Sequence, residues 1–314
     1  MLYGNYQFRC RFESNAVLPY YKGSTFRGVF GRALKKVVCA LKQQECDECL
    51  LSRQCVYALV FETAKSIPAA PDARIEAPPH PFVIEPPLTG KTHFPAGSAF
   101  EFNLLLFGQV NNSLPYFIYA FEQMGRIGIG KKINGRRARF ALECVNSGDQ
   151  VTYTGAEKRF IQPDAHHRLA LAQPDNNGTK TSTTTLTLIT PLRLKFKNRL
   201  KADLSFHVLV RAMLRRISSL FEYYDGGEPD MDYRGLVKRA ENVKIKSSDL
   251  RWFDWRRYSF RQDRSMLMGG MLGSVTYENV ADEFLPLMRF CEKVHLGKQS
   301  AFGLGKIKAR IGHI

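Results

Sequence analysis

The sequence lacks the features that would identify a membrane protein, a secreted protein or a nucleotide-using enzyme. No apolar run is long enough to span a bilayer, and the alternating start "MLYGNYQFRCRF" lacks the apolar region of a signal peptide. The phosphate-binding pattern GxxxxGK[ST] is absent. The glycines of "GRIGIG" stand in the wrong order for a dinucleotide site and precede a predicted strand. These absences predict a cytoplasmic protein that uses no nucleotide cofactor.

Acidic residues are scarce relative to basic ones. The 314 residues include 46 Lys and Arg against 29 Asp and Glu, which gives a formal net charge of +17. This excess favours a polyanionic partner, with an anionic membrane surface as the competing interpretation. Cations alternate with aromatic residues in "RLKFKNRLK" and "RWFDWRRYSFRQDR", a pattern typical of single-stranded RNA binding. No helix-turn-helix, basic zipper or finger is present to read a DNA groove. RNA is therefore the expected partner, and no membrane is expected.

Hydrophobic periodicity predicts the same order of elements in both halves of the chain. In the first half, "YQFRCRF", "SAFEFNLLLFG" and "RARFALECV" alternate like strands, whereas "GSTFRGVFGRALKKVVCAL" and "PYFIYAFEQM" have helical spacing. Ser24 is a fair N-cap for the first helix, and "QCVYALVFE" is the candidate for a strand that the middle of this half still needs. The order β-α-β-β-α-β is that of a ferredoxin-like domain.

The second half repeats this order. Asp203 can cap the long helix "LSFHVLVRAMLRRISSLFEYY", which follows the strand "TTTLTLIT". "LRWFDWRRYSFR" and "GGMLGSVTYE" can pair as a hairpin, before the helix "DEFLPLMRFCEKV" and a final strand in "SAFGLGKIKARI". The predicted fold class is α+β, with two tandem ferredoxin-like (RRM-like) domains over residues 1–176 and 177–314. The loop "AQPDNNGTKTS" is the expected boundary.

Both halves carry a glycine-rich, basic loop between their last helix and last strand. "GIGK" at 128–131 resembles "GLGK" at 303–306. Such glycines can form a tight helix-to-strand turn, or they can let backbone N–H groups approach a phosphate, and both interpretations stay open. Most aromatics of "RWFDWRRYSFR" are expected in the core, with the arginines exposed. The residues predicted to contact RNA are Lys22, Arg27, Arg32, Lys35, Lys36, Gly128, Gly130, Lys131, Lys132, Arg136, Arg137, Arg256, Arg257, Arg261, Gly303, Gly305 and Lys306.

Four of the seven cysteines form a local cluster at residues 39–55. Cys39, Cys46, Cys49 and Cys55 fit the spacing C-x6-C-x2-C-x5-C, which suits a structural zinc ion bound by four thiolates. An iron–sulfur cluster needs the same ligands, and reduced thiols without a metal are the plain alternative. The other three, Cys10, Cys144 and Cys291, fall in strand or helix patterns and are expected in the core.

Several segments together resemble a known family. "LPYYKGSTFRGVFGRALKKVVC", "RIGIGKK", "RWFDWRRYSFRQDRSMLMGGMLG" and "HLGKQSAFGLGK" are similar to the CRISPR-associated endoribonucleases of the RAMP superfamily, which process precursor CRISPR RNA. The resemblance covers nearly the whole chain. It implies tandem ferredoxin-like domains, binding of the CRISPR repeat, and one cut per repeat without a catalytic metal or cofactor. In that reaction the 2′-hydroxyl attacks the adjacent phosphate and leaves a 2′,3′-cyclic phosphate.

The catalytic residues implied by the resemblance are only partly matched. Family members often use a histidine in or near the first helix, but no histidine precedes His80 here. The best remaining candidate is His295, with an ordinary helix-end residue as the alternative interpretation. Tyr20 or Tyr21 could orient a group or donate a proton, and Lys298 could neutralise the phosphate. The alternative function is a non-catalytic RAMP protein that binds guide RNA among other subunits of a CRISPR effector complex.

Overall fold

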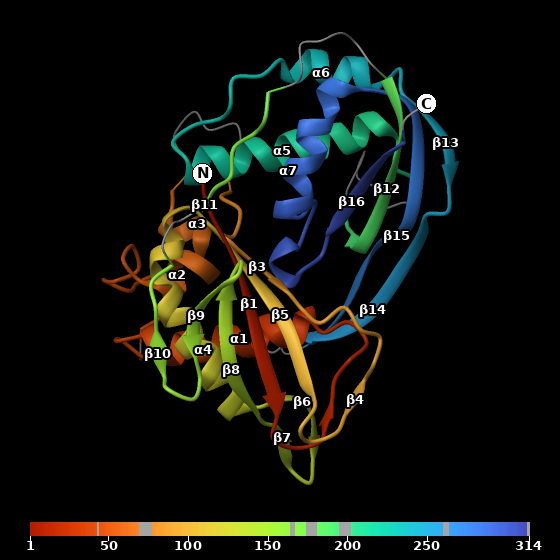
Figure 1. Ribbon diagram of the computed structural model, residues 1–314. Helices are drawn as coiled ribbons and strands as arrows, with labels where there is room; N and C mark the ends of the chain where they lie inside the picture. The colour runs from red at the N-terminus through yellow and green to blue at the C-terminus, as the bar shows by residue number, and fades with distance from the viewer. Residues whose placement is uncertain are drawn as a thin grey trace. The chain divides into compact units, whose positions relative to one another are not determined.

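The computed structural model describes residues 1–42, 44–68, 77–163, 167–173, 181–194, 202–259 and 264–312 (Figure 1). The chain divides into two compact units. Unit 1 comprises Met1–Arg168 with Tyr223–Asp225, and unit 2 comprises Leu169–Glu222 with Gly226–Ile314. None of the helices in these described ranges is both long and apolar enough to cross a membrane.

Unit 1 is built on an antiparallel sheet in the order β10-β9-β8-β1-β5-β3, with β11 also pairing β1. The central strand β1 alternates as its sequence predicts, because Tyr6, Phe8, Cys10 and Phe12 are buried and the residues between them are exposed. The strands are β1 (Leu2–Phe12), β3 (Phe82–Glu85), β5 (Ala99–Phe107), β8 (Phe140–Ser147), β9 (Gln150–Thr154), β10 (Arg159–Phe160) and β11 (His167–Arg168).

Aromatic packing holds two helices on one face of this sheet. Phe30 of α1 (Gly23–Val38) stacks on Phe121 of α4 (Leu114–Ile127) at 4.4 Å between ring centroids, and Phe121 lies 4.7 Å from Phe8 of β1. Burial of each such ring stabilises the fold by roughly 1.5–3 kcal/mol. The smaller elements are α2 (Val56–Phe61), α3 (Thr63–Ser66), the 3-10 turn η1 (Gly108–Ser113), and the strands β2 (Ala16–Val17), β4 (His93–Phe94), β6 (Ile129–Ile133) and β7 (Arg136–Ala138).

Two predictions for unit 1 are wrong. The apolar run Val56–Phe61 is the helix α2 and not a strand, and the missing strand is β3, which pairs with β5. A short apolar run has no decisive period, so its length and neighbours decide its structure. Ser24 does not cap α1 either. The N-cap position belongs to Lys22, which makes no side-chain capping hydrogen bond.

Unit 2 has the same topology. Its antiparallel sheet runs β13-β15-β12-β16, with β14 pairing the other part of β15. The strands are β12 (Thr181–Leu192), β13 (Lys244–Ser248), β14 (Arg251–Ser259), β15 (Arg264–Ala281) and β16 (Ile307–Gly312). The helices are α5 (Phe206–Tyr224), α6 (Tyr233–Ala240) and α7 (Leu285–Val294), with 3-10 turns η2 (Asp282–Phe284) and η3 (Ser300–Phe302). In unit 1 the first strand, β1, lies between β5 and β8, and in unit 2 the first strand, β12, lies between β15 and β16. This arrangement confirms the α+β fold of tandem ferredoxin-like domains.

The start of α5 differs from the prediction. The carbonyl of Ser205 accepts hydrogen bonds from the N–H groups of Val208 and Leu209, so Ser205 and not Asp203 stands at the helix start. The helix α6 and the exposed edge strand β13 have no counterpart among the predicted elements, because both are short and polar. Lys244 and Lys246 on β13 are of the charged kind that protects sheet edges from further pairing.

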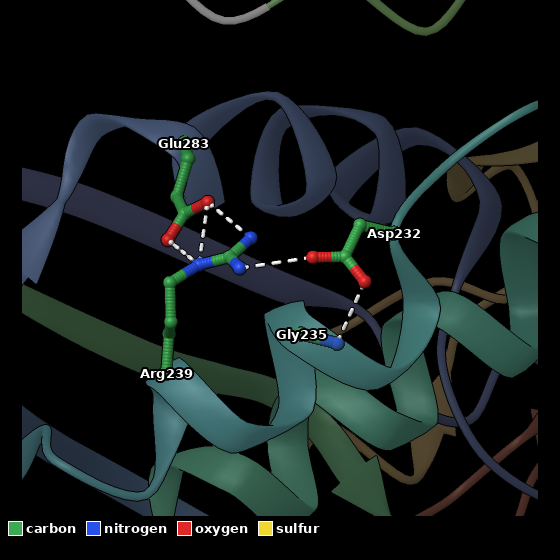
Figure 2. Close-up of polar contacts among 4 residues, drawn as sticks. All are labelled: Asp232, Gly235, Arg239 and Glu283. Carbon is green, nitrogen blue, oxygen red and sulfur yellow. Dashed lines mark hydrogen bonds and ion pairs between the residues drawn. The ribbon is translucent and has the colours of Figure 1, made fainter.

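Charged contacts position α6, which buries only Leu236 and Ala240 (Figure 2). Asp232 caps the helix by accepting a hydrogen bond from the N–H of Gly235 at 2.8 Å. Arg239 donates to the Asp232 carboxylate at 3.0 Å and to both oxygens of Glu283 at 2.8 and 3.1 Å. Exposed ion pairs are worth little singly, but this arginine binds both the N-cap carboxylate of α6 and the Glu283 carboxylate of the turn η2.

Candidate nucleic-acid interface

An exposed basic feature of unit 1 is the hairpin formed by β6 and β7, residues 129–138, called here the basic hairpin. Asn134 and Gly135 join its strands with φ values of 49° and 80°, as a type I′ turn requires. Lys131, Lys132 and Arg136 are exposed on it, and the hairpin projects at the lower edge of Figure 1. The predicted loop is therefore a two-stranded ribbon that presents three cations to solvent.

The glycines at the base of the basic hairpin have steric roles. Gly128 ends α4 with φ 80°, and a Cβ there would lie 2.9 Å from the carbonyl oxygen of Ala138. Gly130 has φ 82°, and its Cβ would lie 2.3 Å from the carbonyl oxygen of Val17. Both positions therefore need glycine for the turn itself. A phosphate contact by their N–H groups stays a prediction.

Helix α1 adds cations beside the basic hairpin. Partial burial and the nearby charge of Arg137 lower the pKa of the Arg32 guanidinium, so these two cations lie close together. Arg137 also donates to the carbonyl of Gly130, which fixes it against the hairpin. Lys36 is exposed at the end of α1, whereas the ammonium of Lys35 lies 5.6 Å from the ring centroid of Tyr57. Two adjacent cations on one surface suit an anionic ligand.

Arg27 is more strongly tied to the protein interior than predicted. Its guanidinium lies 5.0 Å from the ring centroid of Phe61 and contacts Nε2 of His80 at 3.2 Å. Nδ1 of His80 contacts the Thr63 hydroxyl at 3.0 Å. The structure thus brings a histidine to the first helix from 53 residues along the chain. No sequence signal pointed to this contact, because His80 lies in the irregular segment "APPHP".

The segment before α1 contains one exposed, one half-buried and one fully buried candidate. Tyr20 is 63% exposed. Burial and the charge of Glu85 raise the pKa of the Tyr21 hydroxyl, which disfavours proton loss there. Lys22 is fully buried and donates to the carbonyls of Tyr20 and Thr89 at 3.1 and 2.7 Å. Lys22 therefore holds this segment in place, which its burial favours over the predicted RNA contact.

In unit 2, His295 is buried at the end of α7. Its side chain has no exposure, and its Nδ1 lies 3.0 Å from the carbonyl oxygen of Leu304. The guanidinium of Arg216 on α5 donates to the carbonyls of Val294 and His295, which satisfies the end of α7. A catalytic role for His295 stays a prediction, but this burial favours a structural one. Lys298, three residues later, is exposed.

The internal repeat lies in a different register from the one that the sequence suggested. Gly128 ends α4 and His295 ends α7, with φ/ψ of 80°/156° and 59°/154°. Gly130 and Gly297 then follow with φ of 82° and 78°. The structural counterpart of "GIGK" is therefore "HLGK" at 295–298 and not "GLGK" at 303–306. The sequence does not reveal this equivalence, because His295 stands where the first glycine of "GIGK" stands in unit 1.

The predicted residues of "GLGK" hold the end of the loop. Gly303 and Gly305 are buried with φ of 81° and 76°, and a Cβ on Gly305 would clash with the carbonyl of Leu296. The hydroxyl of Thr190 donates to the carbonyl of Gly303, and it accepts from the N–H of Lys306, each at 2.8 Å. These contacts support the turn interpretation, and RNA contact by these residues is untested.

The aromatic and basic strand β14 is more exposed than expected. Phe253 and Trp255 stack at 5.7 Å between ring centroids, and with Trp252 they are half-buried and not part of the core. Arg256 is exposed, as predicted. The Arg257 side chain and all of Arg261 lie outside the described residues.

The four clustered cysteines lie in the segment that joins α1 to α2, residues 39–55, called here the cysteine loop. All four carry free thiols and are partly exposed. Burial raises the pKa of the Cys46 thiol, and Lys35 opposes this effect, whereas Glu62, Cys55 and Cys39 reinforce it. Among the described residues, which omit Gln43 of this loop, no three His, Cys, Asp or Glu side chains are arranged to hold a metal. Elsewhere, Cys10 and Cys291 are buried as expected, whereas Cys144 is half-buried.

Models of known protein families match both halves of the chain. The model AF_1859_N, described as an N-terminal domain, matches residues 1–170, and the model for the CRISPR-associated endoribonuclease Cas6 matches residues 186–307. Residues 186–307 belong to the Cas6 family.

Solved Cas6 structures share the fold over the whole chain. A Cas6 product complex superposes with a TM-score of 0.53 at 11% identity, and covers 98% of this chain and 99% of its own. Thermus thermophilus Cas6 gives a TM-score of 0.52 at 13% identity, with 98% of both chains covered. A partial Cas6-RT-Cas1–Cas2 complex gives 0.56 at 13% identity; the match covers 99% of this chain but only 46% of that one.

A full-length sequence relative is also found. An uncharacterized protein of Archaeoglobus fulgidus is 24% identical over 307 residues, which cover 93% of each chain. The similarity therefore includes both units and the segments between them.

Proposed function

We propose that this chain binds CRISPR repeat RNA and cleaves precursor CRISPR RNA once per repeat. The observation that carries the proposal is the basic hairpin, a two-stranded ribbon with three exposed cations, near Arg32 in a chain of net charge +17. Such a surface neutralises phosphates and releases their counterions. Because the matching family consists of endoribonucleases, we expect the bound RNA to be cleaved.

The proposed reaction needs no catalytic metal. A general base removes the proton from a 2′-hydroxyl, and the 2′-oxygen attacks the adjacent phosphorus. The bond from phosphorus to the 5′-oxygen breaks, and a general acid protonates that leaving oxygen. The products are a 2′,3′-cyclic phosphate and a 5′-hydroxyl end. A cation beside the phosphate stabilises the extra negative charge of the transition state.

Two of the sequence candidates are accessible for these roles. Tyr20 is exposed and its hydroxyl can transfer a proton, and the exposed ammonium of Lys298 can neutralise the phosphate. Tyr21 is half-buried with a raised pKa, and His295 is fully buried, so both are better suited to supporting the loops that carry the accessible groups. Tyr20 and Lys298 belong to different units, and each is proposed on its own exposure.

A cleavage assay on the host repeat RNA tests the proposal. Cleavage should continue in excess chelator and should stop when one 2′-deoxy nucleotide precedes the cut, while binding of that substrate is kept. Tyr20→Phe removes only the hydroxyl and should lower the single-turnover rate by roughly a hundredfold, the usual effect of losing a general acid or base. Cutting of the deoxy substrate, or loss of cutting in chelator, would contradict the mechanism.

The alternative is a non-catalytic RNA-binding subunit. It is favoured by the absence of a histidine from α1 and by the complete burial of His295. The same assay separates the two functions, because a binding subunit retains the repeat RNA uncut under every condition.

A further inference from the structure

Tyr20 is a large aromatic residue held at the surface of unit 1. It is 63% exposed, and because the ring makes up most of a tyrosine's surface, part of the ring faces solvent. One edge of the ring adjoins the backbone of Gly90, where an added Cβ would lie 3.0 Å from Cε2 and 3.7 Å from Cζ. Leu88 and Lys91, on either side of Gly90 in the chain, are also exposed. Tyr20 and residues 88–91 are called here the tyrosine platform.

The buried ammonium of Lys22 joins the two segments of the tyrosine platform. It donates hydrogen bonds to the carbonyl oxygen of Tyr20 at 3.1 Å and to that of Thr89 at 2.7 Å. It also lies 5.9 Å from the ring centroid of Phe94 on β4. These contacts fix the backbone at Tyr20 although its side chain is exposed. A surface ring on a fixed backbone loses less conformational entropy when it binds a ligand.

The tyrosine platform lies near the base of the basic hairpin. A Cβ on Gly130 would lie 2.3 Å from the carbonyl oxygen of Val17, so β6 and β2 are in contact. Val17 pairs with His93 of β4. Tyr20 is three residues after Val17 and Lys91 is two residues before His93, and three residues span at most about 11 Å. An exposed ring and the cations of the hairpin are therefore neighbours on unit 1.

The sheet of unit 1 offers no exposed ring on its central strands. An RRM stacks RNA bases on aromatic side chains of its sheet. Here the exposed residues of β1 and β5 are Asn5, Gln7, Arg9, Arg11, Ala99 and Glu101, and none of them is aromatic. The two arginines also form ion pairs with Glu143 of β8. If unit 1 stacks a base, the ring has to come from outside these two strands.

We propose that the ring of Tyr20 stacks on an unpaired base of the repeat RNA while the basic hairpin binds neighbouring phosphates. The inference rests on the proposed RNA-binding function and adds a base-contacting site to it. Every base has a π-face, so the tyrosine platform recognises an unpaired base and not a particular base identity. Stacking uses the ring of Tyr20, so this role is separate from proton transfer by its hydroxyl.

Binding assays with an RNA that is not cut test the proposal. The probe is the repeat RNA with one 2′-deoxy nucleotide before the cut. Tyr20→Ala should weaken binding about tenfold, the effect of losing one base–aromatic stack, whereas Tyr20→Phe should bind like the wild type. The slope of log affinity against log salt should be unchanged in Tyr20→Ala, because losing a stack removes no phosphate contact.

Tyr116→Ala is the matched control. Tyr116 is 52% exposed, but it lies in the first turn of α4, about 16 Å along the helix from Ile127, the end next to the basic hairpin. This variant should bind the probe like the wild type. All three variants should keep the wild-type melting temperature, because each changes an exposed side chain.

Abasic nucleotides in the probe locate the stacked base. When bases are removed one at a time, one unpaired position should weaken wild-type binding about tenfold. The same abasic probe should cause no further loss in Tyr20→Ala, because the stack is already absent there. Losses that add at every position would show that Tyr20 and the bases act independently, which would overturn the proposal.

Other results would also overturn it. Wild-type binding by Tyr20→Ala would remove the stack, and equal losses in Tyr20→Ala and Tyr20→Phe would indicate a hydroxyl contact in its place. An equal loss in Tyr116→Ala would make the effect non-specific. A wild type that stacks the base but never cuts repeat RNA would keep this inference and remove the proposed cleavage. A chain that cuts the RNA and binds equally well without the Tyr20 ring would do the reverse.

Discussion

At the scale of single residues, His295 stands where the backbone is shaped for glycine. Its φ/ψ of 59°/154° falls in a region that is almost reserved for glycine, and Gly128 occupies the same conformation in unit 1. A side chain in this region costs on the order of 1–3 kcal/mol. The buried contact between Nδ1 of His295 and the Leu304 carbonyl opposes that cost.

Comparing two truncations of His295 measures the strain. His295→Ala and His295→Gly both lose the imidazole, but only the glycine variant relieves the backbone. We expect the glycine variant to be more stable than the alanine variant by about 1 kcal/mol, in the reverse of the usual order. Urea denaturation of both variants gives the difference. An alanine variant equal to or more stable than the glycine variant would show that the backbone at 295 is unstrained.

At the scale of elements, the sequence predicts a helix or strand correctly when its hydrophobic pattern is long and regular. The helix α1 and the strand β5 carry long, regular patterns, and both form where expected. The strand β3 is four residues long and follows the irregular segment that carries His80, so no pattern could identify it. The contact of His80 with Arg27 joins residues 53 positions apart, and it depends on how β3 enters the sheet.

The stability of the helix α6 should depend on pH, because the carboxyl of its N-cap residue Asp232 can take up a proton. The hydrogen bond from Arg239, with the one from the Gly235 N–H, lowers the pKa of the Asp232 carboxyl below its ordinary value near 3.8. The unfolded chain binds this proton more readily, so the stabilisation is complete above about pH 5 and decreases as pH falls through the lower folded-state pKa. Hydrogen exchange of the α6 amides measures this effect. In Asp232→Asn, protection should be lower at neutral pH and should not share this acid-dependent loss.

At the scale of the whole molecule, the excess of positive charge indicated an RNA partner but not where the RNA would lie. The charge is a sum over the sequence, whereas the basic hairpin exists only because Asn134 and Gly135 close a tight turn. The glycine repeat was detected but placed in the wrong register, because the sequence "GLGK" is more similar to "GIGK" than "HLGK" is. The backbone angles at Gly128 and His295 decide the true match.

Two variants of equal charge test whether the basic hairpin binds RNA specifically. Lys131→Gln, Lys132→Gln and Arg136→Gln together should weaken repeat-RNA binding at least tenfold near physiological salt. They should also reduce the slope of log affinity against log salt by about 2, since each lost phosphate contact on a single strand removes about 0.7. The control replaces the exposed Lys244, Lys246 and Arg310 of the unit 2 sheet by Gln. Equal losses in both variants would mean that only the total charge matters.

The position of the first strand in each sheet has a consequence for how the chain folds as it is synthesised. β1 pairs with β5 and β8, and its contacts Gln7–Glu101 and Arg11–Glu143 span 94 and 132 residues. In unit 2, Thr185 of β12 contacts Thr276, 91 residues later. A central strand that is made first has no partners until the ribosome has produced most of its unit. High contact order of this kind slows folding, and the nascent β1 and β12 are the segments most in need of protection from aggregation.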